Sequence, residues 1–302
     1  METNFLTDLM LPLALAIIML GMGLSLAPID FKRVDYYPRA AALGFVNQIV
    51  ILPLVGFLLV LIFGLENLYL AVGIMVLAAC PGGPTSNLIS HISKGDTALS
   101  ISLTAISSLI AVITIPLIIN FSLSHFLQQG EYVPLPVFDT ILRLTLITLV
   151  PVGIGMYIRA KAKKFANKMD KPVKIVSGIL LFLIIFAAIN TNRDIFVSSF
   201  RDVGPVALSL NAVMLSLGFL TARFFKLNLA QSVTISVESG IQNGTLGIMI
   251  ASTLLHNDVM AISPAIYSLI MFMTAGIIIA WMNVGYARMR LLAIRQHRIS
   301  KR

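Results

Sequence analysis

The stretch CPGGPTSN, residues 80–87, interrupts an apolar segment that is otherwise long enough to cross a membrane. Pro81 and Pro84 lack the N–H that a helix needs, and the two glycines between them permit a turn, so the helix has to break here. In a bilayer every backbone N–H and C=O must be satisfied within the protein, which makes such a break costly. We expect a second half-helix to begin near Thr85–Ser86, with a hydroxyl capping its free N–H groups.

The composition of the whole chain is that of a membrane protein. Of its 302 residues 58% are hydrophobic and 12% are charged, whereas a soluble domain has about 25% charged residues. The sequence predicts an all-α polytopic membrane protein with nine transmembrane helices in one transmembrane domain, residues 1–302. The nine apolar runs are 5–26, 38–63, 66–91, 97–126, 136–158, 173–190, 203–223, 229–255 and 260–286.

A second interruption, SVESGIQNGTLGIM at 236–249, lies in the eighth run, five runs after the first. An odd offset reverses the direction of crossing, so runs one to four and six to nine are expected to be inverted-topology repeats. Broken segments at corresponding positions of two repeats are typical of the binding sites of secondary transporters. The expected boundaries are 5–126 for the first repeat, 127–165 for the connector span, 166–287 for the second repeat and 288–302 for a basic cytoplasmic tail.

The basic residues indicate an orientation. Of the 22 Lys and Arg residues, 19 follow odd-numbered runs, the C-terminal tail included, and only Arg143, Arg193 and Arg201 lie on the other side. The positive-inside rule then puts the N-terminus outside and the C-terminus in the cytoplasm of a plasma (inner) membrane. The net charge of +9 is explained by this placement. We expect lipid and an organic anion as partners, no nucleic acid and no obligate protein partner.

The chain has few residues suited to catalysis. Cys80 is the only cysteine, so an intrachain disulfide is excluded, and the four histidines all fall near the ends of runs. The sequence contains no His-Glu-x-x-His, Gly-x-Ser-x-Gly or Walker A motif, and no paired aspartates within the runs. We therefore do not expect an enzyme, and transport would not be driven by ATP.

Glu238 is the only acidic residue deep within any run. A charged side chain at the bilayer centre costs about 2.5–3.5 kcal/mol and needs a partner. The sequence offers no Lys or Arg at that depth, so the partner is either a proton or a bound cation. A neutral, hydrogen-bonded Glu238 with a structural role is the alternative.

Polar residues near the two breaks favour the cation. Their hydroxyl and amide oxygens are hard ligands, and with one carboxylate among them Na⁺ fits better than Ca²⁺. Each hydroxyl could instead bond to its own helix, and each amide could join neighbouring helices. Asn211 in run seven is the counterpart of the run-two amides under the repeat. These polar residues are Asn47, Gln48, Ser86, Asn87, Ser100, Thr104, Gln242 and Asn243.

The motifs GMGLSLAPIDF, NQIVILP, CPGGPTSN, GDTALS with a following Thr, and VESGIQNGTLG together resemble the bile acid:sodium symporter family. The resemblance extends over essentially the whole chain and corresponds to a bacterial nine-span member. It implies two inverted repeats. It also implies that the helices form two groups, namely a core bundle with two broken helices that cross and a panel domain. Spans two, three, four, seven, eight and nine would form the core, and spans one, five and six the panel.

The resemblance also implies two sodium sites and a substrate site. The first sodium site would comprise Ser86, Asn87, Ser100, Thr104 and Glu238. The second would comprise Gln48, Glu238 and Gln242, with backbone oxygens of Ser239 and Ile241. The substrate would contact Asn243, Thr85, Pro84 and Met271; similar bacterial members often have Thr in place of Pro84, and some have His in place of Met271.

We therefore expect a sodium-coupled symporter of an organic anion, bile-acid-like or a small carboxylate, that works by alternating access. Without a Lys or Arg in the core, the site should balance about one carboxylate, and we expect bile acids to be poor ligands. The alternatives are a sodium-independent efflux carrier of a related fold and a membrane receptor that does not transport.

Overall fold

The computed structural model describes residues 9–300 except 129, 131 and 192, and within this range the side chains of Arg33, Asp170 and 285–300 are not described. The described residues form helices and no strand apart from one isolated bridge. The expectation of an all-α protein is therefore confirmed for them. Residues 5–8 of the first run, the side chains of the predicted tail and residues 301–302 lie outside the described part.

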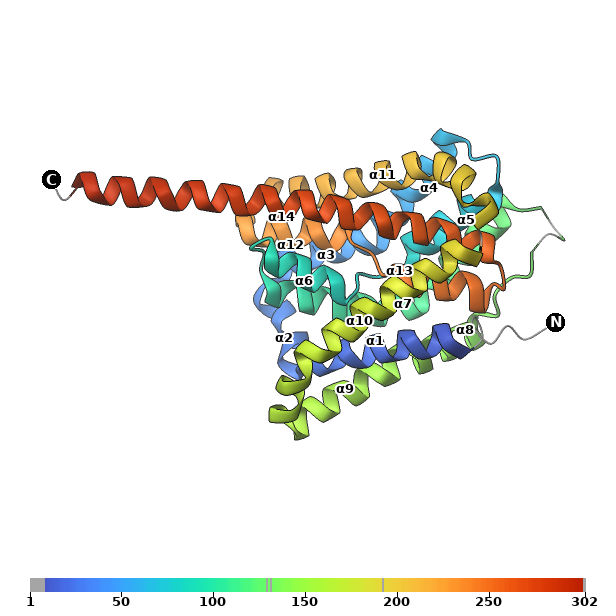
Figure 1. Ribbon diagram of the computed structural model, residues 1–302, viewed down its shortest axis with the longest axis horizontal. Helices are drawn as coiled ribbons and strands as arrows, with labels where there is room; N and C mark the ends of the chain where they lie inside the picture. Colours follow the sequence, from blue (N-terminus) through green and yellow to red (C-terminus); the bar gives the residue numbers. More distant parts are fainter. Residues whose placement is uncertain (1–8, 129, 131, 192, 301–302) are drawn as a thin grey trace.

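The helices follow one another with short connections, and three of them contain a π-helical turn (Figure 1). The elements are α1 (Leu11–Ser25), α2 (Pro28–Tyr36), α3 (Pro38–Val46), η2 (Asn47–Ile51), α4 (Leu52–Phe63), α5 (Leu68–Ala79), α6 (Pro84–Ile92), α7 (Thr97–Phe126), α8 (Val137–Leu144), η3 (Thr145–Leu149), α9 (Val150–Lys161), α10 (Lys163–Thr191), α11 (Arg193–Phe224), α12 (Leu229–Gly240), α13 (Gly244–Met249), η4 (Ile250–Leu254) and α14 (Asp258–Ser300).

Six of the described helices are long and apolar enough to cross a membrane, or seven if the bent pair α1–α2 is one span. A multi-pass membrane protein is thus confirmed, whereas the count of nine spans stays a prediction. The difference lies mainly in the two interrupted runs. Each is divided into half-helices that are too short to count as membrane spans by themselves, such as Leu68–Ala79 and Gly244–Leu254.

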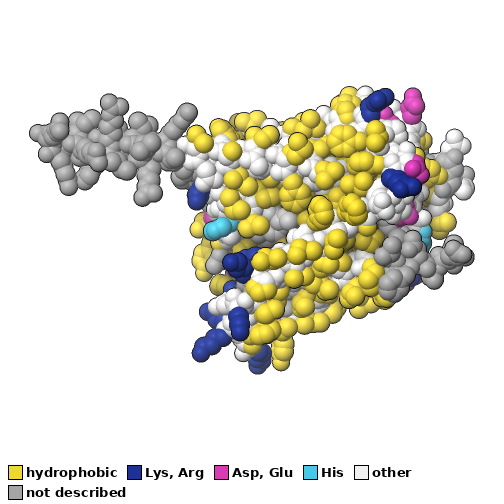
Figure 2. All heavy atoms as spheres, viewed as in Figure 1, with side chains coloured by type: hydrophobic (Ala, Val, Ile, Leu, Met, Phe, Trp, Pro, Cys, Tyr) yellow, Lys and Arg dark blue, Asp and Glu magenta, His cyan; other side chains and the backbone are white. Residues whose placement is uncertain are grey.

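The charged side chains lie at the two ends of the molecule, and hydrophobic side chains cover the face between them (Figure 2). Lys and Arg gather where α9 meets α10, and the opposite end carries Asp and Glu together with further Lys or Arg. A surface with an apolar middle and charged ends matches a bilayer with water on both sides.

Helix α1 packs closely against α9 and α10 (Figure 1). A Cβ on Gly23 would overlap the Val152 carbonyl oxygen, and one on Gly21 would overlap Cγ1 of Val173. The GMGL motif therefore provides room for neighbouring helices.

The two breaks meet in the interior. Gly82 pairs with Gln242 in an isolated antiparallel bridge, and the Asn243 N–H donates to the Pro81 carbonyl at 2.9 Å. Each break thus supplies backbone partners to the other, as the bilayer interior requires. This contact brings the polar residues of the two interrupted helices to one place.

Candidate ion and substrate site

The helix that follows the first break begins without the hydroxyl cap that the sequence predicts. Cys80 has an extended backbone, as a residue before proline prefers, and α6 begins at Pro84 after Gly83. Ser86 Oγ donates to the Gly83 carbonyl at 2.8 Å, so the expected hydroxyl cap on the N–H groups of α6 is wrong. The second half-helix, α13, does have a cap, because Asn243 Oδ1 accepts from the Leu246 N–H at 3.1 Å.

Glu238 lies in a cluster of side-chain oxygens that comes from three interrupted or neighbouring helices. Its Oε1 accepts from Ser100 Oγ at 2.5 Å and its Oε2 from Thr104 Oγ1 at 2.8 Å. Both hydroxyls also approach Asn87 Oδ1, at 2.8 and 3.2 Å, and Ser86 Oγ lies 3.3 Å from Thr104 Oγ1. The structure thus brings together all five side chains of the first predicted sodium site.

The cluster combines one carboxylate with neutral oxygens. Glu238 is 4% exposed, and within the described residues it forms no ion pair. The described part of the chain also holds no group of three or more His, Cys, Asp and Glu that could bind a metal ion. The arrangement suits a hard monovalent cation, which would neutralise the buried carboxylate.

The second predicted site contains two amides that contact each other. Gln48 lies on the π-helical turn η2, a feature frequent at functional sites. Its Nε2 donates to Gln242 Oε1 at 2.8 Å and to the Cys80 carbonyl at 2.9 Å. Gln242 Nε2 donates to the Ser239 carbonyl at 2.8 Å, and Ile241 is the extended residue that directly follows α12. The predicted residues are thus neighbours.

The two halves of the chain make a matching contact at each break. Gln48 binds the carbonyl of Cys80, the residue that directly follows α5, and Asn211 Nδ2 binds the carbonyl of Gly240, the last residue of α12, at 2.8 Å. Asn211 was expected as the counterpart of the run-two amides. The shared contact favours the inverted repeat, which stays a prediction.

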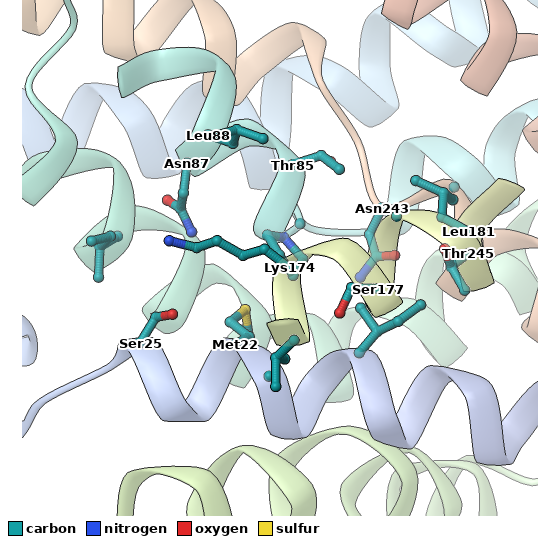
Figure 3. A pocket seen from close by; sticks show the side chains of 18 of the residues that line it. Met22, Ser25, Thr85, Asn87, Leu88, Lys174, Ser177, Leu181, Asn243 and Thr245 are labelled. Atoms are coloured by element: carbon teal, nitrogen blue, oxygen red, sulfur yellow. The ribbon is translucent and has the colours of Figure 1, made fainter. Parts of the chain in front are cut away.

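A cavity of about 380 Å³ lies beside the crossing point, between α1 and α10 on one side and α6 and α13 on the other (Figure 3). All four predicted substrate residues line it, namely Pro84, Thr85, Asn243 and Met271. Asn87 and Gln242, from the two predicted sodium sites, line it as well. The candidate ion and substrate sites therefore share residues.

Sequence reasoning missed the α10 side of this cavity. Lys174, Ser177, Gly178 and Leu181 line it at helical spacing, and Lys174 extends toward Asn87 (Figure 3). The sequence argument considered only Lys and Arg of the predicted core, and it did not consider a positive charge from α10, which belongs to the predicted panel. The sequence did indicate that Lys174 belongs to a helix, since it falls inside the sixth apolar run, but it was treated as a loop charge.

The model of the Sodium Bile acid symporter family matches residues 12–199, which is more than half of the chain. The protein belongs to this family. The expected resemblance is confirmed, and the protein is a transporter rather than an enzyme.

Members of the sodium bile acid symporter family from bacteria, plants and mammals resemble the chain. It is 33% identical over 255 residues to the uncharacterized sodium-dependent transporter YocS of Bacillus subtilis (strain 168), covering 84% of this chain and 77% of YocS. It is 30% identical to the probable chloroplastic sodium/metabolite cotransporter BASS1 of Oryza sativa subsp. japonica, covering 83% and 60%. It is 29% identical to the human ileal sodium/bile acid cotransporter, covering 93% and 82%.

Proposed function

We propose that the protein is a sodium-coupled symporter of organic anions that binds two Na⁺ ions and works by alternating access. The observation that carries the proposal is the position of Asn87. Its Oδ1 accepts from Ser100 and Thr104 in the Glu238 cluster, and the same residue lines the cavity. An ion bound to this cluster would hold Asn87 in a fixed position in the wall of the substrate site. The relatives named as sodium-dependent transporters support sodium as the ion.

Binding of the two Na⁺ ions would replace hydrogen bonds that the cluster residues now make to each other. At the first site the ligands would be Ser86, Asn87, Ser100, Thr104 and Glu238. At the second they would be Gln48, Glu238 and Gln242 with the carbonyls of Ser239 and Ile241. Gln48 and Gln242 would turn their amides so that the oxygens face the ion.

The cavity supports a small organic anion. Its volume of about 380 Å³ is at the lower end of the range of about 300–1,000 Å³ typical of ligand pockets. The Asn243 side chain points toward Ser177 across it (Figure 3), which offers hydrogen bonds to a carboxylate, hydroxyl or keto group. In alternating access α1 and α10 would move relative to α6 and α13, and this motion would expose the cavity to each side in turn.

Thermal stability of the purified protein tests the proposal. A ligand that binds the folded state raises the melting temperature, by an amount that grows with concentration. We expect small hydroxy- and keto-acids to raise it in Na⁺ and much less in K⁺, and taurocholate to have a weaker effect. Equal stabilisation in K⁺ would favour the sodium-independent carrier, and binding without uptake into vesicles would favour the receptor. Tight binding of taurocholate alone would contradict a small-acid substrate.

The proposed orientation is tested by labelling single cysteines in a Cys80→Ala background. Ala162 lies between α9 and α10, at the end expected to be cytoplasmic, and Val133 is 84% exposed in the α7–α8 loop. A membrane-impermeant thiol reagent applied to intact cells should label Val133→Cys strongly and Ala162→Cys only after lysis. Equal labelling of both in intact cells would contradict the proposed topology.

A further inference from the structure

We infer that Ser177 of α10, together with Asn243 and Thr245 at the second break, selects acids with an oxygen atom on the carbon next to the carboxylate. The inference rests on the proposed function and deepens it by assigning a specificity-determining residue to the α10 side of the cavity. It follows from three polar groups in the cavity wall that have no partner within the described part of the chain.

Ser177 presents its hydroxyl to the cavity and not to its own helix. A serine within a membrane helix can bond to the carbonyl four residues earlier, as Ser122 of α7 does to Ile118 at 2.7 Å. Ser177 lines the cavity and makes no hydrogen bond to any residue that the structure describes. The neighbouring Gly21 of α1, whose Cβ would lie 3.4 Å from Ser177 Oγ, adds no side chain that would cover it.

The amide of Asn243 offers a donor to the same space. Its Oδ1 accepts from the Leu246 N–H at 3.1 Å, so the NH₂ group is the end left for the cavity. Asn243 is 7% exposed and points toward Ser177 (Figure 3). Thr245 is 3% exposed and lines the cavity as well, and its hydroxyl bonds to no described residue. Since a buried polar group without a partner is destabilising, these groups favour a ligand that supplies hydrogen bonds.

The three groups suit an oxygen substituent and disfavour an ammonium group. An amide NH₂ only donates, whereas the hydroxyls of Ser177 and Thr245 both donate and accept. A substrate hydroxyl or keto oxygen can accept from Asn243, while an ammonium group has no lone pair to do so. Gln242, a ligand of the second proposed Na⁺, directly precedes Asn243 and lines the cavity. A carboxylate attracted to that ion would therefore hold its neighbouring carbon beside Asn243.

Water in a cavity without substrate can satisfy the same groups. If that is their only role, replacing one of them changes the affinity for every acid by the same factor. Substrate recognition changes the ratio between acids that differ only in this substituent. The ratio is therefore the quantity to measure.

The test measures binding to the full-length protein in Na⁺ for two matched sets of acids. One set is propionate, lactate, pyruvate and alanine, and the other is hexanoate, 2-hydroxyhexanoate, 2-oxohexanoate and norleucine. In the set that binds better, we expect the hydroxy- and keto-acid to bind at least about tenfold more tightly than the unsubstituted acid, because a site built to hydrogen-bond a substituent rejects the analogue that lacks it. The amino acid should bind no more tightly than the unsubstituted acid.

The variants locate the effect. Ser177→Ala and Thr245→Val should each lower this preference about fivefold and leave the affinity for the unsubstituted acid within about twofold. Ser122→Ala removes a hydroxyl that bonds to its own helix outside the cavity, and it should keep the wild-type preference. Equal binding of all members of both sets by the wild type, or an equal loss of the hydroxy- and the unsubstituted acid in Ser177→Ala, would overturn the inference while the proposed function stands. Absence of sodium-dependent binding for every acid would contradict the proposed function as well.

Discussion

Glu238→Gln is expected to lower the affinity for Na⁺ by about a hundredfold or more and to abolish sodium-dependent uptake. The substitution keeps the shape of the side chain and removes its charge. Glu238 is the carboxylate at the centre of the oxygen cluster, and it would contribute to both sodium sites. Removing one member of a buried charge pair costs about 3–5 kcal/mol. The measurement is the shift in melting temperature of the purified variant as Na⁺ replaces K⁺.

Thr104→Ala serves as the control in the same cluster. Thr104 donates one hydrogen bond to Glu238 Oε2 at 2.8 Å and carries no charge. Losing one neutral contact costs about 1 kcal/mol, so its sodium affinity should fall only about fivefold. If Glu238→Gln keeps normal sodium-dependent stabilisation and uptake, the carboxylate is structural and the proposed coupling is wrong.

Gly82→Ala is expected to cause the second large loss of sodium binding. A Cβ at this position would lie 2.8 Å from Glu238 Oε2 and 3.2 Å from Ser86 Oγ. The methyl group would thus occupy space beside the carboxylate that an ion and its ligands need. We expect the sodium-dependent rise in melting temperature to disappear, measured alongside the yield of monodisperse protein.

Gly83→Ala is the matched control one residue later. The nearest atoms to its Cβ would be those of Asn243, at 3.5 Å, an ordinary contact distance. This variant should fold and retain its sodium-dependent stabilisation. A Gly82→Ala protein that responds to Na⁺ like Gly83→Ala would show that the space next to Glu238 is not part of an ion site.

The sequence predicts the interrupted helices well because prolines and glycines have few other uses inside an apolar run. Pro81 and Pro84 place the first break within a residue or two, and the glycines and polar residues of SVESGIQNGTLGIM, 236–249, indicate the second, which lies between α12 and α13. The meeting of the two breaks through Gly82 and Gln242 depends on tertiary packing. It could be expected only from the family resemblance.

Other features depend on details that the residue pattern does not encode. The predicted role of Ser86 as a helix cap was wrong because its hydroxyl can bond either to a free N–H or to a carbonyl. In the structure it donates to the Gly83 carbonyl. The π-helical turn at Gln48 leaves no mark on the apolar pattern. Lys174 was assigned to a loop because a charge near the end of an apolar run usually lies in one. Only the packing of α10 against α1 puts this side chain in the cavity wall.

Sodium-driven accumulation in proteoliposomes tests the central claim most directly. The probe is the radiolabelled acid that gives the largest sodium-dependent rise in melting temperature. With a higher Na⁺ concentration outside, the account predicts that the acid accumulates inside above its external concentration, and that a sodium ionophore or the Glu238→Gln substitution abolishes this accumulation. Uptake that is unchanged when K⁺ replaces Na⁺ on both sides would contradict the account.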